Sequence, residues 1–148
     1  MVKDIYPWSN SSSPYYLTNV NSVLYFLADD GVHGNELLKS DGTETGTVMV
    51  KDIYPGSNSS SPYYLTNVNS VLYFSAIDVD NGLQLCKSNG TEAGTVFVKS
   101  TWSESASSYP LNLTNVNGIL YFGANSVNGI SYFGTHDIVS SNDLWKSD

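Results

Sequence analysis

The sequence is poor in basic residues and lacks any long apolar run. Only 6 of its 148 residues are Lys or Arg, against 14 Asp or Glu, and the formal net charge is −8. Phosphate backbones and anionic lipid surfaces are normally met by clustered Lys and Arg, so nucleic acid is not expected as a partner. The longest unbroken apolar run, residues 23–28, is far shorter than the roughly 20 residues of a spanning helix. Membrane insertion is therefore not expected either.

Cysteine is almost absent. Cys86 stands alone, so no intramolecular disulfide can form, which fits a reducing compartment and a disulfide-free secreted protein equally well. The N-terminus shows no apolar signal segment, and the compartment stays unknown. With 41% apolar, 13% aromatic and only 14% charged residues, the chain has enough material for a packed core, which excludes disorder.

The dominant feature of the chain is an internal repeat. The motif Leu-Thr-Asn-Val-Asn starts at residues 17, 65 and 113, and Leu-Tyr-Phe follows each copy at the same distance. Residues 1–48 recur with few changes at 49–96, whereas the third copy has drifted and carries an insertion near 123–142. A fixed period of this length indicates a repeat architecture. The sequence predicts one segment, 1–148, with units at 14–53, 62–101 and 110–148.

Each unit has the pattern of antiparallel strands. No apolar stripe at helical spacing is present, and runs rich in Val, Tyr, Phe and Thr are bounded by Asn, Gly, Ser and Pro. Asp41-Gly42 is expected to form a two-residue type I′ turn, which needs positive φ at both residues. The first unit thus predicts a four-stranded meander with strands near residues 15–20, 23–28, 36–40 and 47–53.

The apolar pattern favours a β-propeller within the all-β class. Residues 23–28 are apolar on both faces, so both faces of that strand should be covered by neighbouring sheets. Residues 36–40 alternate more and are expected to be an outer strand facing water. Four-stranded antiparallel blades packed around an axis satisfy both patterns, and the chain would supply three of them. A β-solenoid is the alternative, although its repeats are usually shorter.

The segment Glu36-Leu37-Leu38-Lys39-Ser40-Asp41-Gly42-Thr43 resembles the ELWxxDGT repeat family, and the resemblance recurs at 84–91 and, truncated, at 143–148. It covers essentially the whole chain. Leu38 and Cys86 replace the Trp of the consensus, and Asn89 replaces its Asp. The resemblance implies a bacterial, propeller-like repeat of large, often cell-surface proteins. No activity is assigned to the family, so it supplies no catalytic residue.

The two ends of the chain indicate an assembly. Residues 1–5 align with 49–53, the fourth strand of a unit, while the third unit stops inside the turn that should precede its own fourth strand. Three blades are too few to close a propeller. We therefore expect a head-to-tail homodimer with six blades, in which strand exchange closes the ring; a nine-bladed trimer and a longer array of blades are alternatives. The exchanging residues would be Val2, Lys3, Asp4 and Ile5 of one copy, with Leu144 and Trp145 of the other.

No catalytic constellation is present, and the chain is not expected to be an enzyme: it has no nucleophile elbow, phosphate loop or Cys-x-x-Cys, and its two histidines lie in non-equivalent loops. A calcium site is one hypothesis, because Asp78 and Asp80 stand two apart before a glycine. No bidentate Glu follows at the expected distance, and the same residues make ordinary turns. No other cofactor is expected.

Aromatic residues in loops suggest a second function class, binding of a glycan. Sugars stack on exposed aromatic rings beside polar groups, and an insertion in a loop is a common place for binding residues. The rings could equally cap the core or a subunit junction, and the insertion could be a neutral expansion. The sequence therefore leaves two functions open, a structural or adhesive module and a lectin-like propeller. The candidate ligand-binding residues are Trp8, Trp102, Tyr132, Phe133 and His136.

Overall fold

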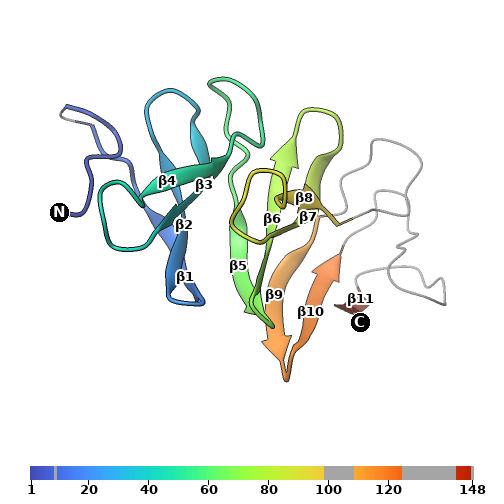
Figure 1. Ribbon diagram of the computed structural model, residues 1–148. Coiled ribbons are helices and arrows are strands. Elements are labelled where there is room, and N and C mark those ends of the chain that lie inside the picture. Colours follow the sequence, from blue (N-terminus) through green and yellow to red (C-terminus); the bar gives the residue numbers. More distant parts are fainter. Residues whose placement is uncertain (9, 99–108, 125–142, 148) are drawn as a thin grey trace.

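The computed structural model describes residues 1–8, 10–98, 109–124 and 143–147, and in these it contains strands and no helix (Figure 1). The strands form three antiparallel sheets, in each of which strands adjacent in sequence pair with one another. The first sheet holds β1 (Tyr15–Val20), β2 (Val23–Asp29), β3 (Asn35–Ser40) and β4 (Val48–Lys51); the second holds β5 (Tyr63–Val68), β6 (Val71–Asp78), β7 (Gly82–Ser88) and β8 (Val96–Phe97); the third holds β9 (Leu111–Val116), β10 (Ile119–Ala124) and β11 (Asp143–Ser147).

The all-β prediction is confirmed, and the strands of the first unit lie within a few residues of their predicted positions. The first two units are four-stranded meanders, as predicted, and the third has three strands among the residues described. None of these residues belongs to a helix long and apolar enough to cross a membrane.

The turn prediction at Asp41-Gly42 is wrong. Gly42 has a φ of 92°, but Asp41 has no positive φ, and seven residues separate β3 from β4. The Asp41 side chain folds this loop instead, since its Oδ1 accepts hydrogen bonds from the amide and hydroxyl of Thr43. The two-residue turn with both φ values positive is Asn21-Ser22 (52° and 64°), which joins β1 to β2.

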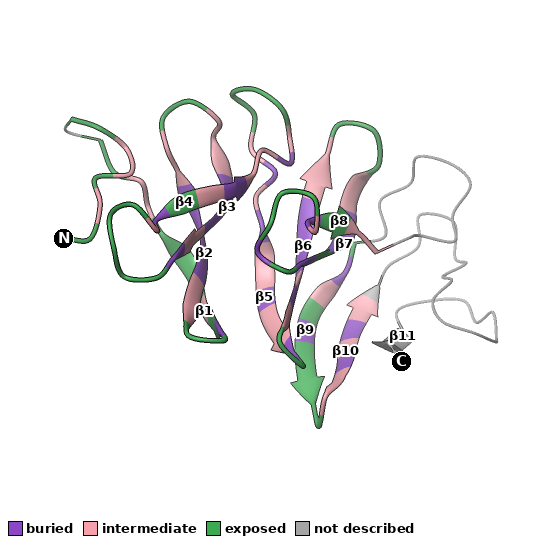
Figure 2. Ribbon diagram, viewed as in Figure 1, coloured by how far each residue is buried: buried purple, intermediate pink, exposed green. Residues whose placement is uncertain are grey.

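The second strand buries both of its faces, as its sequence predicts (Figure 2). Tyr25 belongs to a cluster that reaches the second sheet, whereas Phe26 and Ala28 belong to a separate cluster on the opposite face. The expectation that residues 36–40 form a water-facing outer strand is wrong, because β3 lies between β2 and β4 and Glu36 is fully buried. Burying a carboxylate requires hydrogen-bond donors around it.

Neighbouring sheets approach one another most closely along their first strands. β1 lies against β5, and β5 lies against β9, so the three strands run side by side down the centre of the molecule (Figure 1). The outer strands β4 and β8 make no comparable backbone approach to the next sheet. The sheets therefore fan out from a shared inner edge, and the junctions between them are the surfaces that the repeat builds.

Candidate functional site

The junctions between sheets carry the same hydrogen bonds in each repeat. The Thr18 hydroxyl donates to the Leu65 carbonyl at 3.0 Å, and one unit later the Thr66 hydroxyl donates to the Leu113 carbonyl at 3.1 Å. A side-chain hydroxyl that bonds across a junction fixes the height of one sheet against the next. The identical partners show that both junctions have the same register.

A second series of bonds runs in the opposite direction. The Asn67 amide donates from Nδ2 to the Asn19 carbonyl at 3.0 Å, and the Asn115 amide donates to the Asn67 carbonyl at 2.7 Å. Each bond spans 48 residues, which is the length of the repeat. Each inner strand is thus linked to its neighbour both by a threonine and by an asparagine.

Apolar side chains fill the space behind these bonds. Burial of such side chains stabilises by about 1.5–3 kcal/mol each, so the junctions hold much of the stability of the fold. Cys86 takes the place of Leu38 in the repeat and is buried at one junction, where burial raises the pKa of its thiol. A buried, protonated thiol packs as a small apolar group. The first junction contains Val20, Tyr25, Leu37, Val50, Ile53, Leu65, Leu72, Phe74, Ala76 and Cys86, and the second contains Val68, Leu85, Leu113, Leu120 and Phe122.

The N-terminal segment, residues 1–5, packs against the first sheet as β4 packs against the second. Lys3 donates from Nζ to the Thr47 carbonyl at 2.8 Å, and Lys51 donates to the Thr95 carbonyl at 3.0 Å, with 44 residues between the partners in both cases. Ile5 packs on the cluster behind β2, as Ile53 does in the first junction. The segment therefore occupies the position of a fourth strand belonging to a preceding unit.

The predicted strand exchange itself stays a prediction. Val2, Lys3, Asp4 and Ile5 belong to no strand. Leu144 and Trp145 lie in β11, where their backbones pair with residues 123 and 122 of β10. This is the register of β3 against β2, in which Leu37 and Leu38 pair with residues 27 and 26.

Glu36 joins the first sheet to the connection that leads into the second. It is fully buried, and its carboxylate accepts hydrogen bonds from the amides of Ile53 (3.1 Å), Tyr54 (3.3 Å) and Ser60 (2.9 Å) and from the Ser60 hydroxyl (2.5 Å). Burial raises the pKa of Glu36, and these bonds oppose the rise. The Glu of the ELWxxDGT-like segment thus has a structural task, and Gln84 replaces it in the second unit.

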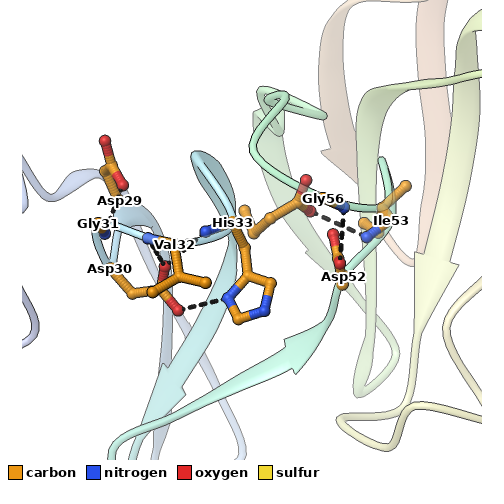
Figure 3. Close-up of polar contacts among 9 residues, drawn as sticks. Asp29, Asp30, Gly31, Val32, His33, Asp52, Ile53 and Gly56 are labelled. Carbon is orange, nitrogen blue, oxygen red and sulfur yellow. Dashed lines mark hydrogen bonds and ion pairs between the residues drawn. The ribbon is translucent and has the colours of Figure 1, made fainter.

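The loop between β2 and β3 is built on Asp30 (Figure 3). Its Oδ1 accepts from the amides of Val32 and His33, and its Oδ2 lies 2.7 Å from Nδ1 of the His33 ring. Burial acts to raise the pKa of Asp30, but its bonds to His33 and Val32 are stronger together and lower it; the side-chain bond to Asp30 raises the pKa of His33. Asp30 and His33 thus form a turn that is closed by an ion pair and is partly open to water. No nucleophile of the described chain is bonded to these two residues.

Asp52 lies beside this loop (Figure 3). Its Oδ2 accepts from the Gly56 amide at 3.2 Å, while its buried Oδ1 has no partner among the residues described. The charge of Asp52 adds to the rise in the pKa of His33. No three His, Cys, Asp or Glu side chains of the described chain are close enough together to hold a metal ion.

The calcium hypothesis at Asp78 and Asp80 receives no support from the geometry and stays a prediction. Asp78 repeats Asp30: its Oδ1 accepts from the amides of Asp80 and Asn81, and its Oδ2 accepts from the Asn81 side chain. The carboxylate oxygens of Asp78 are thus used by the turn itself. No interaction of the Asp80 carboxylate with Asp78 or its partners is found among the described residues. The sequence already indicated this equivalence, because Asp29-Asp30-Gly31 is the counterpart of this segment in the first unit.

The candidate ligand-binding residues are not brought together. Trp8 is 92% exposed, has a φ of 79°, and packs on no cluster of the described residues. Trp102, Tyr132, Phe133 and His136 lie outside the residues described. Trp8 is thus exposed in its loop, as expected, and no ring contact of Trp8 is found among the described residues.

A different aromatic group lines a cavity of about 330 Å³ between the first two sheets. Tyr15, Tyr16 and Tyr63 border it together with Asn35 and Ser61. The rings of Tyr16 and Tyr63 meet edge to face, with centroids 5.6 Å apart and an interplanar angle of 88°. The sequence analysis placed Tyr15 and Tyr16 only in a strand near residues 15–20, because aromatic residues are common in strands, and so did not identify this group.

The residues that line this cavity are not all repeated at the second junction. In the register of the repeat, Leu83 stands where Asn35 stands and Leu111 stands where Tyr63 stands, so the second junction lacks both the amide and one ring.

The chain has no match among protein-family models, curated proteins or solved structures.

Proposed function

We propose that this chain is a non-enzymatic structural module whose sheets are consecutive blades of a β-propeller assembled from several copies. A six-bladed homodimer is favoured, and a nine-bladed trimer is the alternative. The observation that carries the proposal is the recurrence of the same junction: the bonds of Thr18 and Asn67 at the first junction return as those of Thr66 and Asn115 at the second. A junction that repeats without change can be extended by further units.

The fan of sheets supports a ring rather than a flat stack. Close contact along β1, β5 and β9, with wider spacing toward β4 and β8, gives each sheet the wedge shape of a blade. Propellers usually need 4 to 8 blades to close, and three sheets leave the two outermost faces uncovered. The resemblance to the ELWxxDGT repeats supports a cell-surface or adhesive role for such a ring.

The mass of the protein in solution tests the assembly. Light scattering after size-exclusion chromatography should give about 32 kDa for the dimer, twice the 16.1 kDa of one chain, or about 48 kDa for the trimer. The mass should stay constant over a tenfold dilution in the micromolar range. A single species at 16.1 kDa would overturn the proposal that the chain assembles with itself.

Glycan binding is the second candidate function, and the tyrosine-lined cavity is the observation that favours it. Aromatic rings offer stacking surfaces for the C–H faces of a sugar, and the Asn35 amide and Ser61 hydroxyl border the same space. A glycan array would test it with the native protein and with Tyr16→Ala. Tyr109→Ala, in which a 44% exposed tyrosine away from the cavity is removed, is the matched control. Equal signals from both variants would reject the cavity as the binding site.

A further inference from the structure

The structure points to a specific interface between two copies of this chain: the exposed outer face of the first sheet packs on the exposed outer face of the third sheet of another copy. This inference rests on the proposed function and names the surfaces that would carry it. Both faces are recognised by comparing each exposed residue with its buried equivalents one or two units along the chain.

Leu17 marks the outer face of the first sheet. It is 62% exposed, whereas its equivalents Leu65 and Leu113 are 9% and 8% exposed because each packs on the preceding sheet. The three leucines stand at the same position of identical Leu-Thr-Asn-Val-Asn motifs. Leu17 therefore has the side chain of a junction residue but no preceding sheet to cover it among the residues described.

Val116 marks the outer face of the third sheet in the same way. It is 46% exposed, whereas Val20 and Val68 are 5% and 6% exposed because each packs against the following sheet. Val20 contacts the cluster that includes Leu65, and Val68 contacts the cluster that includes Leu113. By the same spacing, Val116 would meet Leu17 of a second copy.

The polar groups of the two faces match as well. Thr18 and Thr66 donate across their junctions, but Thr114 bonds only to the Asn112 carbonyl of its own strand in the part of the chain that is described. Docking in the register of the internal junctions would let Thr114 donate to the Leu17 carbonyl of the other copy. Three side chains per interface, two apolar and one polar, thus have equivalents that are satisfied inside the chain.

Asn19 completes this set from the other side. Its Oδ1 accepts from the Ser22 amide, as the Oδ1 of Asn67 accepts from Ser70. The Nδ2 of Asn67 also donates to the preceding strand, and no such acceptor faces Asn19 within the described ranges. In the docked pair the Nδ2 of Asn19 would donate to the Asn115 carbonyl of the other copy.

The N-terminal segment fits the same arrangement. It already lies against the first sheet in the position of the fourth strand of a preceding unit, with Lys3 in the role of Lys51. In the first sheet, Leu37 pairs with Lys51 and Leu38 with Met49. Docking of a second copy would bring β11, the last strand of its sheet among the described residues, beside this segment. The equivalent pairs would then be residue 144 with residue 3 and residue 145 with residue 1.

Such an interface joins two different faces, so it is head to tail. Head-to-tail contacts form a ring when the rotation closes and a filament when it does not. Two copies would use the interface twice and cover both exposed faces. An occupant of another kind, or pairing of like faces, would give a different response to the variants below.

The test uses the full chain with one charge placed on each face, Leu17→Asp or Val116→Asp. Val79→Asp is the matched control, because Val79 is 64% exposed but lies in the loop between β6 and β7. Each face variant alone should fall to the monomer mass while keeping the far-ultraviolet spectrum of the native protein, and the control should keep the native mass. Mixing the two face variants should restore a species of two chains, because one interface between native faces can still form.

The outcomes separate this inference from the proposed function. A native protein that is oligomeric, with face variants that keep its mass, would overturn the interface and leave the assembly standing. Loss of association in Leu17→Asp alone, with Val116→Asp unaffected, would show pairing of like faces and also overturn it. A monomeric native protein would overturn both. Restored association in the mixture requires both variants to be folded, so misfolding cannot imitate the expected result.

Discussion

Removal of the Glu36 carboxylate should strongly destabilise the protein. In Glu36→Ala the amides of Ile53 and Ser60 lose their acceptor inside the protein, since Ile53 is 7% exposed and Ser60 is fully buried. An unsatisfied buried donor costs about 1–3 kcal/mol, and the two together cost roughly 2–6 kcal/mol. Relief of the buried charge offsets part of this loss. We expect the free energy of unfolding to fall by about 3 kcal/mol.

Glu36→Gln is the matched variant, because Gln84 stands at this position in the second unit. The amide oxygen can still accept from Tyr54 and Ser60, but its NH₂ group faces the Ile53 amide, so one hydrogen bond is lost at a cost of about 1–2 kcal/mol. Urea unfolding followed by circular dichroism, at one protein concentration, measures both variants. A Glu36→Ala midpoint equal to that of the native protein would refute the argument.

The contribution of Glu36 to the free energy of unfolding should depend on pH in a defined direction. Because burial raises the pKa of Glu36 above its usual 4.5, the native state binds a proton more readily than the unfolded state. The contribution of this group to stability is therefore complete below pH 4.5 and is lost as the pH rises through the raised value. The difference in unfolding free energy between native protein and Glu36→Gln should shrink over that interval. A difference that grows with pH would show that the hydrogen bonds outweigh burial.

Three further predictions test the junction and the loops. Leu65→Ala should lower the free energy of unfolding by about 2–5 kcal/mol, whereas Leu17→Ala at the equivalent exposed position should change the unfolding of an isolated chain by less than about 0.5 kcal/mol; equal effects would contradict the burial difference. Nuclear magnetic resonance titration should place the pKa of His33 above 6.5 and return it toward that value in Asp30→Asn, and an unchanged pKa would exclude the ion pair. Trp8→Gly should raise the melting temperature by a few degrees, because a left-handed conformation costs a bulky residue roughly 1–2 kcal/mol; a lower melting temperature would show that the ring packs.

The strands could be predicted from the sequence because each obeys a local rule. Runs of β-branched and aromatic residues between Asn, Gly and Pro gave the bounds of β1, β2 and β3 to within about two residues. The double-sided apolar pattern of residues 23–28 correctly implied cover on both faces. These features depend on residues close together in the chain, and the 48-residue repeat confirmed each one in a second copy.

The turns were harder because side chains, as well as φ preferences, shape them. Asp41-Gly42 has the composition of a type I′ turn, but hydrogen bonds from Thr43 to Asp41 stabilise a wider loop. The two-residue turn at Asn21-Ser22 was predicted from the strands on either side of it, although its serine, at φ 64°, is a residue type that a type I′ turn does not favour. Its third copy is Asn117-Gly118, a strong hairpin dipeptide.

The bulge in each first hairpin could not be predicted at all. Tyr16 and Tyr64 have φ values of 57° and 56°, a conformation that costs a bulky side chain energy and that no propensity suggests. The pairing register shifts at this point in each of the first two sheets. Such strain persists only where surrounding contacts enforce it, and those contacts come from the adjacent sheet. In the third unit the equivalent residue is Asn112, with φ 55°, a residue type that tolerates this conformation more easily.

The sequence differences between the first two units are concentrated in one stretch of each unit. The residues that contact across the junction, such as Thr18 and Val20, are identical to those one unit later, whereas the substitutions concentrate between residues 27 and 38. That stretch contains the loop built on Asp30 and includes Asn35, which borders the tyrosine-lined cavity. Packing of one sheet on the next restricts which side chains the inner strands can carry. The loops at one end of each sheet are not restricted in this way. We therefore expect a ligand that distinguishes one unit from another to contact residues of this stretch, such as Asn35.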